Sequence, residues 1–152
     1  MIIIFLDIDG VMNSESYYKT VNRKLKNWSR FNPISVNIVS KLVKEFNAKI
    51  VISSLWRFAM QKELSTELKS SGLINFLHKD WSTPIVQPGH RGKEIKLWLD
   101  SHPDISEFLI LDDDEDILIE HSSRHIKTTL ADGLQEEHYY KARQILEQYF
   151  AF

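Results

Sequence analysis

The sequence predicts an α/β domain with a mainly parallel sheet, because short apolar segments typical of buried strands alternate with longer segments of helical spacing. In addition, three of the strand-like segments end in polar side chains, at residues 7–9, 53–54 and 112–113. In a parallel sheet all carboxyl ends lie along one edge, and this edge is where α/β proteins bind ligands. We therefore expect the three polar sets, which are far apart in sequence, to converge on one site.

The first strand is expected at Ile2–Leu6, an apolar run that leads directly into two acids. The stretch that follows, Val11–Phe31, is polar and aromatic without clean periodicity. A helix is expected to begin at Asn32-Pro33, a cap residue and a first-turn proline, and its apolar residues recur at helical spacing up to Phe46. Lys49–Ile52 is the second expected strand.

Two helices are expected in the middle of the chain, with a segment between them that is harder to interpret. The first helix covers 59–71 and the second covers 92–99. Between them, the sequence suggests a short strand near Ile74–Leu77 and then a loop closed by Pro84 and Pro88. The last third predicts a buried strand at 108–111 that ends in a run of acids, a final strand at 125–129 and a final helix at 135–150.

Length and composition are those of one globular domain. The chain has 152 residues, 43% of them hydrophobic and 26% charged, which is enough for one core and too few for two ordinary domains. We expect a single domain over 1–152, with a flap or insert at about 11–32 and a short insert at about 72–90. The net charge of −2 does not indicate a general nucleic-acid or membrane binder. No apolar run approaches the roughly 20 residues of a membrane span, so we expect no membrane partner. The sequence has no cysteine, which is compatible with the cytoplasmic location that we expect.

Asp7 and Asp9 follow an apolar strand directly, and carboxylates in such a place are costly unless a cation lies beside them. Mg²⁺, a hard cation that prefers oxygen ligands, fits that need. Asp7 is the expected nucleophile, which would form an aspartyl-phosphate. Asp9 would protonate the leaving oxygen and later deprotonate the attacking water. Gly10 allows the close backbone approach or positive φ that this turn and a bound substrate require.

The second and third polar sets are expected to complete a phosphoryl-transfer site. Ser53 offers a hydroxyl donor to a phosphoryl oxygen, and its neighbour Ser54 is the alternative substrate-binding hydroxyl. Lys93 opens a helix and would stabilise the charge on the phosphoryl oxygens. Trp56 is interpreted as a core residue.

Asp112 and Asp113 are expected to bind the metal together with Asp7 and Asp9, while Asp114 remains an alternative ligand. Two arginines allow two interpretations each. Arg57 either binds a second phosphate of the substrate or is structural, and Arg91 either helps to bind the substrate or is a loop residue.

A basic stretch without acids lies between the first strand and the first long helix, and aromatic residues are interleaved with it. Its members are Lys19, Arg23, Lys24, Lys26 and Arg30, with Tyr17, Tyr18, Trp28 and Phe31. Either the aromatic residues pack onto the domain beneath a solvated flap, or the stretch binds a polyanion and stacks on bases over the active site.

Four segments in this order resemble the haloacid-dehalogenase-like (HAD) phosphohydrolases, and more narrowly the small HAD domain of Swiss Army Knife RNA-repair-like proteins. They are Phe5–Asn13 (FLDIDGVMN), Lys49–Arg57 (KIVISSLWR), Arg91–Leu99 (RGKEIKLWL) and Phe108–Asp116 (FLILDDDED). The resemblance implies a Rossmann-like three-layer sandwich with a minimal cap, Mg²⁺ dependence and phosphomonoesterase activity. It also implies that Asp9 binds the metal through its backbone carbonyl. The implied substrate is a phosphorylated small molecule or a nucleic-acid end, and a kinase or ligase of a repair system remains an open partner.

Three other functions remain open. A receiver-type signalling domain also uses acids, a hydroxyl and a lysine on an α/β sheet, but its acceptor aspartate lies on a middle strand and its lysine comes last. A metal-dependent glycosyltransferase with an Asp-x-Asp motif would need more room than 152 residues provide. A catalytically silent nucleic-acid-binding module of a repair system is disfavoured by the intact set of acids.

Overall fold

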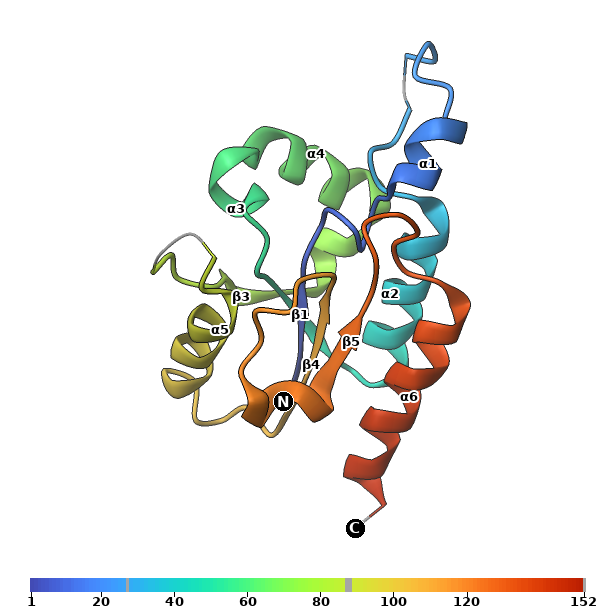
Figure 1. Ribbon diagram of the computed structural model, residues 1–152. Helices are drawn as coiled ribbons and strands as arrows, with labels where there is room; N and C mark the ends of the chain where they lie inside the picture. The colour runs from blue at the N-terminus through green and yellow to red at the C-terminus, as the bar shows by residue number, and fades with distance from the viewer. Residues whose placement is uncertain (27, 87–88, 152) are drawn as a thin grey trace.

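The computed structural model describes residues 1–26, 28–86 and 89–151 of the chain. Its centre is a sheet of five strands, all parallel, in the order β3-β2-β1-β4-β5, with helices on both faces (Figure 1). The strands are β1 (Ile2–Leu6), β2 (Lys49–Ile52), β3 (Leu77–Ser82), β4 (Glu107–Asp112) and β5 (His125–Lys127). The predicted α/β class and parallel sheet are therefore confirmed.

The register of β1 with its two neighbours aligns the carboxyl ends of three strands. Leu6, the last residue of β1, lies opposite Ile52 of β2 and Leu111 of β4. The backbone N–H of Asp7 donates to the carbonyl oxygen of Leu111 at 3.0 Å, and that of Ser53 donates to the carbonyl oxygen of Leu6 at 3.1 Å. The three polar sets therefore begin side by side at one edge of the sheet, as expected.

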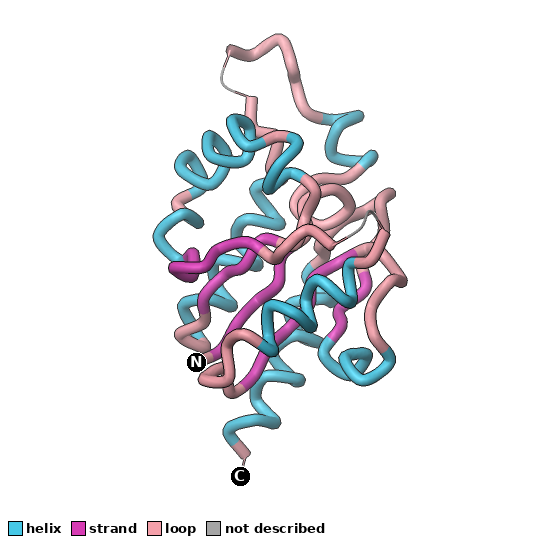
Figure 2. The backbone as a smooth tube through the Cα atoms, turned by 90° about the vertical axis from the view of Figure 1, so that its left-hand side faces the viewer, coloured by secondary structure: helices cyan, strands magenta, loops and turns pink. Residues whose placement is uncertain are grey.

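Helices cover both faces of the sheet and complete three layers. The α-helices in the described ranges are α1 (Glu15–Thr20), α2 (Pro33–Glu45), α3 (Trp56–Ala59), α4 (Gln61–Ser71), α5 (Arg91–Asp100) and α6 (Glu136–Phe150). Successive side chains of a strand point to opposite faces. Accordingly Ile2, Ile4 and Leu6 of β1 share a core with α2, α4 and α6, whereas Ile3 and Phe5 pack against α5. Figure 2 shows α5 in front of the sheet.

The segment after α4 differs from the prediction. A short strand is predicted near 74–77, whereas the structure has a 3₁₀ turn at Leu73–Phe76, followed by β3. Gly72, with φ 78°, ends α4 and allows this turn. β3 is an edge strand with mostly exposed or half-buried side chains, so it lacks the apolar run that marks the other strands. In the loop that follows, Pro84 is described and Pro88 lies outside the described residues.

The helix predicted over 59–71 is divided in the structure. The one-turn helix α3 begins before it, and α4 begins after a break at Met60, whose φ of −136° and ψ of 47° are not helical. The earlier start follows from Ser54, whose side-chain oxygen accepts a hydrogen bond from the backbone N–H of Trp56 at 3.2 Å. A hydroxyl in this position satisfies an N–H group at the beginning of a helix.

The flap, defined here as residues 14–31, contains a short helix that the sequence does not reveal. Ser14 caps the first turn of α1, and the chain then forms a loop that projects at the top of Figure 1. The flap returns to the domain at Phe31, which is fully buried. Glu67 of α4 anchors this return, because its carboxylate accepts hydrogen bonds from the Ser29 hydroxyl at 2.8 Å and from the backbone N–H of Arg30 at 3.0 Å.

Candidate active site

Three carboxylates gather at the carboxyl edge of the sheet. Asp7 follows β1, Asp112 ends β4 and Asp113 comes next. One oxygen from each of the three residues lies within 4.8 Å of the other two. Asp7 and Asp112 are buried, at 5% and 0% exposure, and Asp113 is half-buried. A group of hard oxygen ligands at this spacing is suited to a divalent cation such as Mg²⁺.

The electrostatics of the cluster also favour a cation. Burial, followed by the charge of Asp112, raises the pKa of Asp7 to about 7. Burial, followed by the hydrogen bond with Asp7, raises the pKa of Asp113 to about 6, and burial raises the pKa of Asp112 as well. The pKa values of these three neighbouring acids are all raised, and the carboxylates repel one another once they are charged. A divalent ion would remove that repulsion, so the donor set fits the metal that the sequence predicts.

Arg91 is the cation that contacts these carboxylates. One of its guanidinium nitrogens, Nη1, forms ion pairs with Asp112 and, at 3.3 Å, with Oδ1 of Asp7. Its backbone N–H donates to the carboxylate of Asp116 at 2.8 Å, which ties the start of α5 to the acidic loop after β4. The sequence allows Arg91 either a substrate-binding role or a place in a loop. In the structure its guanidinium contacts two of the three carboxylates.

Lys93, the expected charge stabiliser, is exposed to solvent. Within the described ranges it forms neither an ion pair nor a side-chain hydrogen bond, so its catalytic role remains a prediction. Residues two apart on a helix point about 200° apart around its axis. The two side chains therefore leave the helix in different directions, and sequence spacing alone does not indicate which one contacts the carboxylates.

Gly10 brings the turn after β1 against the acidic loop. Its φ is +79°, and a Cβ added here would lie 2.5 Å from Oδ2 of Asp113. A glycine is therefore required both by the backbone conformation and by the close approach, which agrees with the positive φ anticipated from the sequence. Its carbonyl oxygen accepts a hydrogen bond from the Thr128 hydroxyl, and the N–H of Thr128 donates to the carbonyl oxygen of Asp112 at 3.1 Å. Thr128 links the two acid-bearing loops and carried no signal in the sequence.

The two adjacent serines have different surroundings. Ser53 is fully buried, and its hydroxyl has no hydrogen-bond partner in the described part of the chain. The hydroxyl of Ser54 instead accepts a hydrogen bond from the backbone N–H of Trp56, the first residue of α3. A buried hydroxyl without a partner is unusual and suggests a ligand group, so the geometry favours Ser53 over Ser54 as the phosphate-binding hydroxyl. Thr83, which follows β3, also has a buried hydroxyl without a partner among the described residues, and the sequence analysis did not identify it.

Arg57 makes all its side-chain hydrogen bonds within the protein, which favours the structural interpretation over substrate binding. It is 4% exposed, and it bridges α3, the loop after β3 and α5. Its five guanidinium N–H groups donate to the carbonyl oxygens of Ser53, Ser54, Thr83 and Pro84 and to the carboxylate of Glu94. Because a guanidinium has five such groups, none is left for a second phosphate.

Asp9 lies outside the carboxylate cluster and is exposed. One oxygen of its carboxylate accepts a hydrogen bond from Nδ2 of Asn13 at 2.9 Å. The other accepts a hydrogen bond from the indole Nε1 of Trp56 at 3.0 Å. Trp56 is buried, as expected of a core residue, but its ring nitrogen faces the site, and Asn13 was not singled out by the sequence analysis. No sequence pattern would have paired these two donors with Asp9, because one of them lies 47 positions away.

The flap borders this acid. Burial, followed by the charge of Asp9, raises the pKa of Tyr18, so the phenol and the carboxylate are neighbours. The guanidinium of Arg23 lies 5.0 Å from the ring centroid of Tyr18 and 5.7 Å from that of Trp28, and Arg30 lies 5.1 Å from the Trp28 ring. Phe31 packs onto the domain, as the interpretation of a solvated flap requires. The side chains of Lys19, Arg23, Lys24 and Lys26 are exposed, as binding of a polyanion requires. Features of both interpretations are therefore present.

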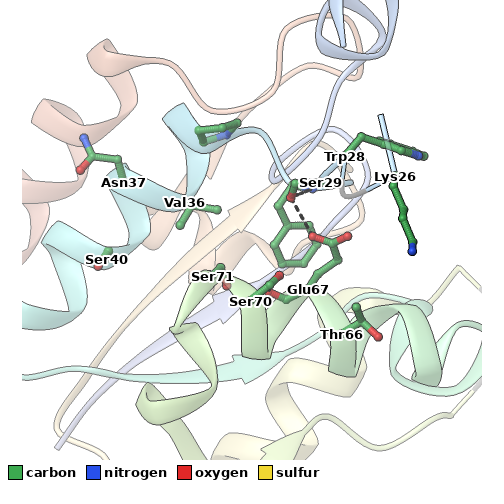
Figure 3. A pocket seen from close by; sticks show the side chains of 12 residues that line it. Lys26, Trp28, Ser29, Val36, Asn37, Ser40, Thr66, Glu67, Ser70 and Ser71 are labelled. Atoms are coloured by element: carbon green, nitrogen blue, oxygen red, sulfur yellow. Dashed lines mark hydrogen bonds between the residues drawn. The ribbon is translucent and has the colours of Figure 1, made fainter. Parts of the chain in front are cut away.

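Two hollows lie near the site, and they differ in their relation to the carboxylates. One, of about 690 Å³, lies between α2, α4 and the flap, and Figure 3 shows Ser29, Glu67 and Trp28 on its walls. None of its lining residues belongs to the carboxylate cluster. A smaller hollow, of about 270 Å³, adjoins Arg91 and Asp114. Its remaining lining residues are Leu55, Phe58, Ile85, Gly89 and Glu94.

Comparison with known families identifies one that spans most of the chain. The family described as the HAD domain in Swiss Army Knife RNA repair proteins matches residues 3–139. This range contains the three carboxylates, Arg91 and both serines. None of the curated proteins compared with the chain matches it. The described helices include none whose length and apolar character would suffice to cross a membrane.

Proposed function

Since the chain belongs to the family of HAD domains in Swiss Army Knife RNA repair proteins, we propose that it is a Mg²⁺-dependent phosphatase that hydrolyses phosphomonoesters through an aspartyl-phosphate at Asp7. The observation that carries the proposal is the carboxylate cluster at the end of β1 and β4, with the Arg91 guanidinium against it. The buried, unpartnered hydroxyl of Ser53 at the adjoining strand end supports it further.

Two displacements at phosphorus make up the proposed reaction. In the first, a carboxylate oxygen of Asp7 attacks phosphorus, and the bond to the leaving oxygen breaks while Asp9 protonates that oxygen. In the second, Asp9 takes a proton from a water molecule whose oxygen attacks phosphorus. The bond between phosphorus and Asp7 then breaks, which releases inorganic phosphate and restores the carboxylate.

The other residues hold and neutralise the phosphoryl group. Ser53 and Arg91 are proposed to donate hydrogen bonds to its non-bridging oxygens. Arg91 would then have the charge-stabilising role that the sequence predicts for Lys93. Asp7, Asp112 and Asp113, with the backbone carbonyl of Asp9, would hold Mg²⁺, which supplies positive charge to the phosphoryl oxygens. Gly10 lets the turn that carries Asp9 approach Asp113 closely.

We further propose that the substrate is a nucleic-acid end rather than a small phosphorylated metabolite. The family description names RNA repair proteins, and Tyr18 of the flap lies beside the proposed acid, Asp9, with the exposed guanidinium of Arg23 5.0 Å from the Tyr18 ring. The apolar hollow next to Arg91 has room for an uncharged part of the substrate. A kinase or ligase as a partner in repair is a prediction that rests on the family description alone.

The test is hydrolysis of a panel of phosphomonoesters that includes nucleotides and 3′- and 5′-phosphorylated oligonucleotides, with and without Mg²⁺. Wild-type protein is expected to release phosphate only with the metal, and Asp7→Asn is expected to abolish turnover. Asp104→Asn is the matched control, because Asp104 is an exposed acid that precedes β4, at the opposite edge of the sheet. Turnover that survives Asp7→Asn or chelation of the metal would refute the mechanism. A stable phosphoryl adduct without turnover would favour a receiver-type domain.

A further inference from the structure

The carboxylate of Asp9 is held by two donors from different parts of the chain. Nδ2 of Asn13 donates to Oδ1 at 2.9 Å, and Nε1 of Trp56 donates to Oδ2 at 3.0 Å. Asp9 itself is exposed, so packing around its side chain does not restrict it. The orientation of its carboxylate therefore depends on these two hydrogen bonds.

Trp56 is a rigid donor. It is 4% exposed, and its ring packs against Phe31 with 6.2 Å between ring centroids. Its backbone N–H is bound to the hydroxyl of Ser54, so the tryptophan is fixed to the strand end that carries Ser53. An indole N–H can only donate, which means that it orients a carboxylate without competing for its proton.

Asn13 is fixed in the same way on the other side of Asp9. It is 2% exposed, and its Oδ1 accepts a hydrogen bond from the backbone N–H of Gly10 at 3.2 Å. With the amide oxygen directed to Gly10, the amide nitrogen faces Asp9. Each oxygen of Asp9 that accepts one hydrogen bond still has a second lone pair. The residue can therefore transfer a proton while it is held.

We infer that Trp56 and Asn13 are positioning residues that aim Asp9 at the leaving oxygen and at the attacking water. The inference rests on the proposed phosphatase function and assigns these two residues to its proton-transfer steps. General acid–base catalysis needs hydrogen-bond reach between the acid and the reacting oxygen. A displacement of about 1 Å in a catalytic group can lower a rate by about 100-fold. Loss of either donor should therefore lower the reaction rate more when the leaving group needs a proton from Asp9 than when it does not.

The test compares two leaving groups in a single turnover with Mg²⁺ present. The alcohol of a nucleoside 5′-monophosphate needs a proton as it departs, whereas p-nitrophenolate departs without one. Trp56→Phe keeps an aromatic ring in the core and removes the N–H donor. We expect it to slow release of the nucleoside about 10-fold or more, and release of p-nitrophenol less than about 3-fold. Asn13→Ala removes the other donor and is expected to slow release of the two leaving groups to the same unequal extents. It tests the inference if Trp56→Phe does not fold.

Two controls separate positioning from a merely structural effect. Trp81→Phe changes an exposed tryptophan on β3 and is expected to leave both rates unchanged. In an Asp9→Asn background, Trp56→Phe should slow nucleoside release no further, because the group that it positions is already gone. Equal losses with both leaving groups, or a full additional loss in the Asp9→Asn background, would overturn the inference while leaving the phosphatase proposal intact. Failure of the wild-type protein to release phosphate from these two esters and from the phosphorylated oligonucleotides would overturn both.

Discussion

Arg91 reaches the carboxylates from the first turn of α5, and Lys93, two residues along the same helix, is exposed to solvent. Both residues lie in Arg91–Leu99, the third of the four segments that resemble the HAD family. The sequence predicts that the catalytic cation is the lysine. The contacts favour the arginine, whose planar fork suits carboxylates and phosphoryl oxygens better than the ammonium group of lysine does. At the residue scale, the contacts add Arg91 to the candidate cations, and the catalytic role of Lys93 remains a prediction.

Single substitutions distinguish the two cations. Arg91→Ala is expected to lower kcat by about 100-fold, the usual order of loss for one donor to a developing negative charge. Lys93→Ala is expected to change kcat by less than about threefold, because the side chain lies in water. The measurement is Mg²⁺-dependent hydrolysis of the best substrate of the panel, with circular dichroism to confirm folding. A larger loss for Lys93→Ala than for Arg91→Ala would restore the assignment made from the motif.

At the scale of elements, the strands that carry the site were predictable and the short elements around them were not. β1, β2 and β4 are apolar runs buried on both faces, so their type and their polar ends could be identified from the sequence. β3 is exposed at the sheet edge, and α1 and α3 are too short for helical periodicity to appear. The elements that remained hidden are those with few buried apolar residues.

The same reasoning explains which site residues could be found. Acids at strand ends can be identified from the sequence because they directly follow apolar runs, as Asp7 and Asp112 do. Trp56, Asn13 and Thr128 act through hydrogen bonds whose partners depend on the tertiary fold. Their composition and spacing resemble those of ordinary core and loop residues, so no pattern in one sequence would have marked them.

The flap provides a prediction at this scale. Its basic side chains are exposed, its Tyr18 lies beside Asp9, and Glu67 anchors its return to the domain. Arg23→Ala with Lys24→Ala should therefore lower kcat/KM for a phosphorylated oligonucleotide about 10-fold or more at low salt, and leave p-nitrophenyl phosphate nearly unaffected. Lys62→Ala with Lys69→Ala, an equal change of charge on exposed positions of α4, is the matched control. Equal losses with the long and the small substrate would refute binding of a polyanion by the flap.

At the scale of the whole molecule, the parallel register makes one site from segments more than 100 positions apart. That site also affects stability. Burial raises the pKa of Asp7 to about 7 and that of Asp113 to about 6, both above the 3.8 of a free carboxyl. The folded protein therefore keeps these protons up to a higher pH than the unfolded chain does. In the absence of metal, the free energy of unfolding should fall as pH rises from about 4 to about 7.

Asp113→Asn tests this electrostatic strain. It removes one of the like charges and should raise the free energy of unfolding of the metal-free protein at pH 8. The expected gain is below the value that about 1.4 kcal/mol per pKa unit would give, because Asp113 is only half-buried and water screens its charge. Urea denaturation in a chelator measures the change, and Asp104→Asn again serves as the control. Mg²⁺ should stabilise the wild-type protein more than the variant. A variant that is less stable than wild type at pH 8 without metal would show that the cluster is not strained.

The central claim is that a phosphoryl group passes through Asp7, and the most direct measurement is the site of phosphorylation during turnover. The reaction is stopped with acid within one turnover, and the labelled peptide is identified by mass spectrometry. We predict a label on Asp7 that forms only with Mg²⁺ and decays as inorganic phosphate appears. Hydrolysis of the substrate without any label on Asp7, or with the label on another residue, would contradict the account.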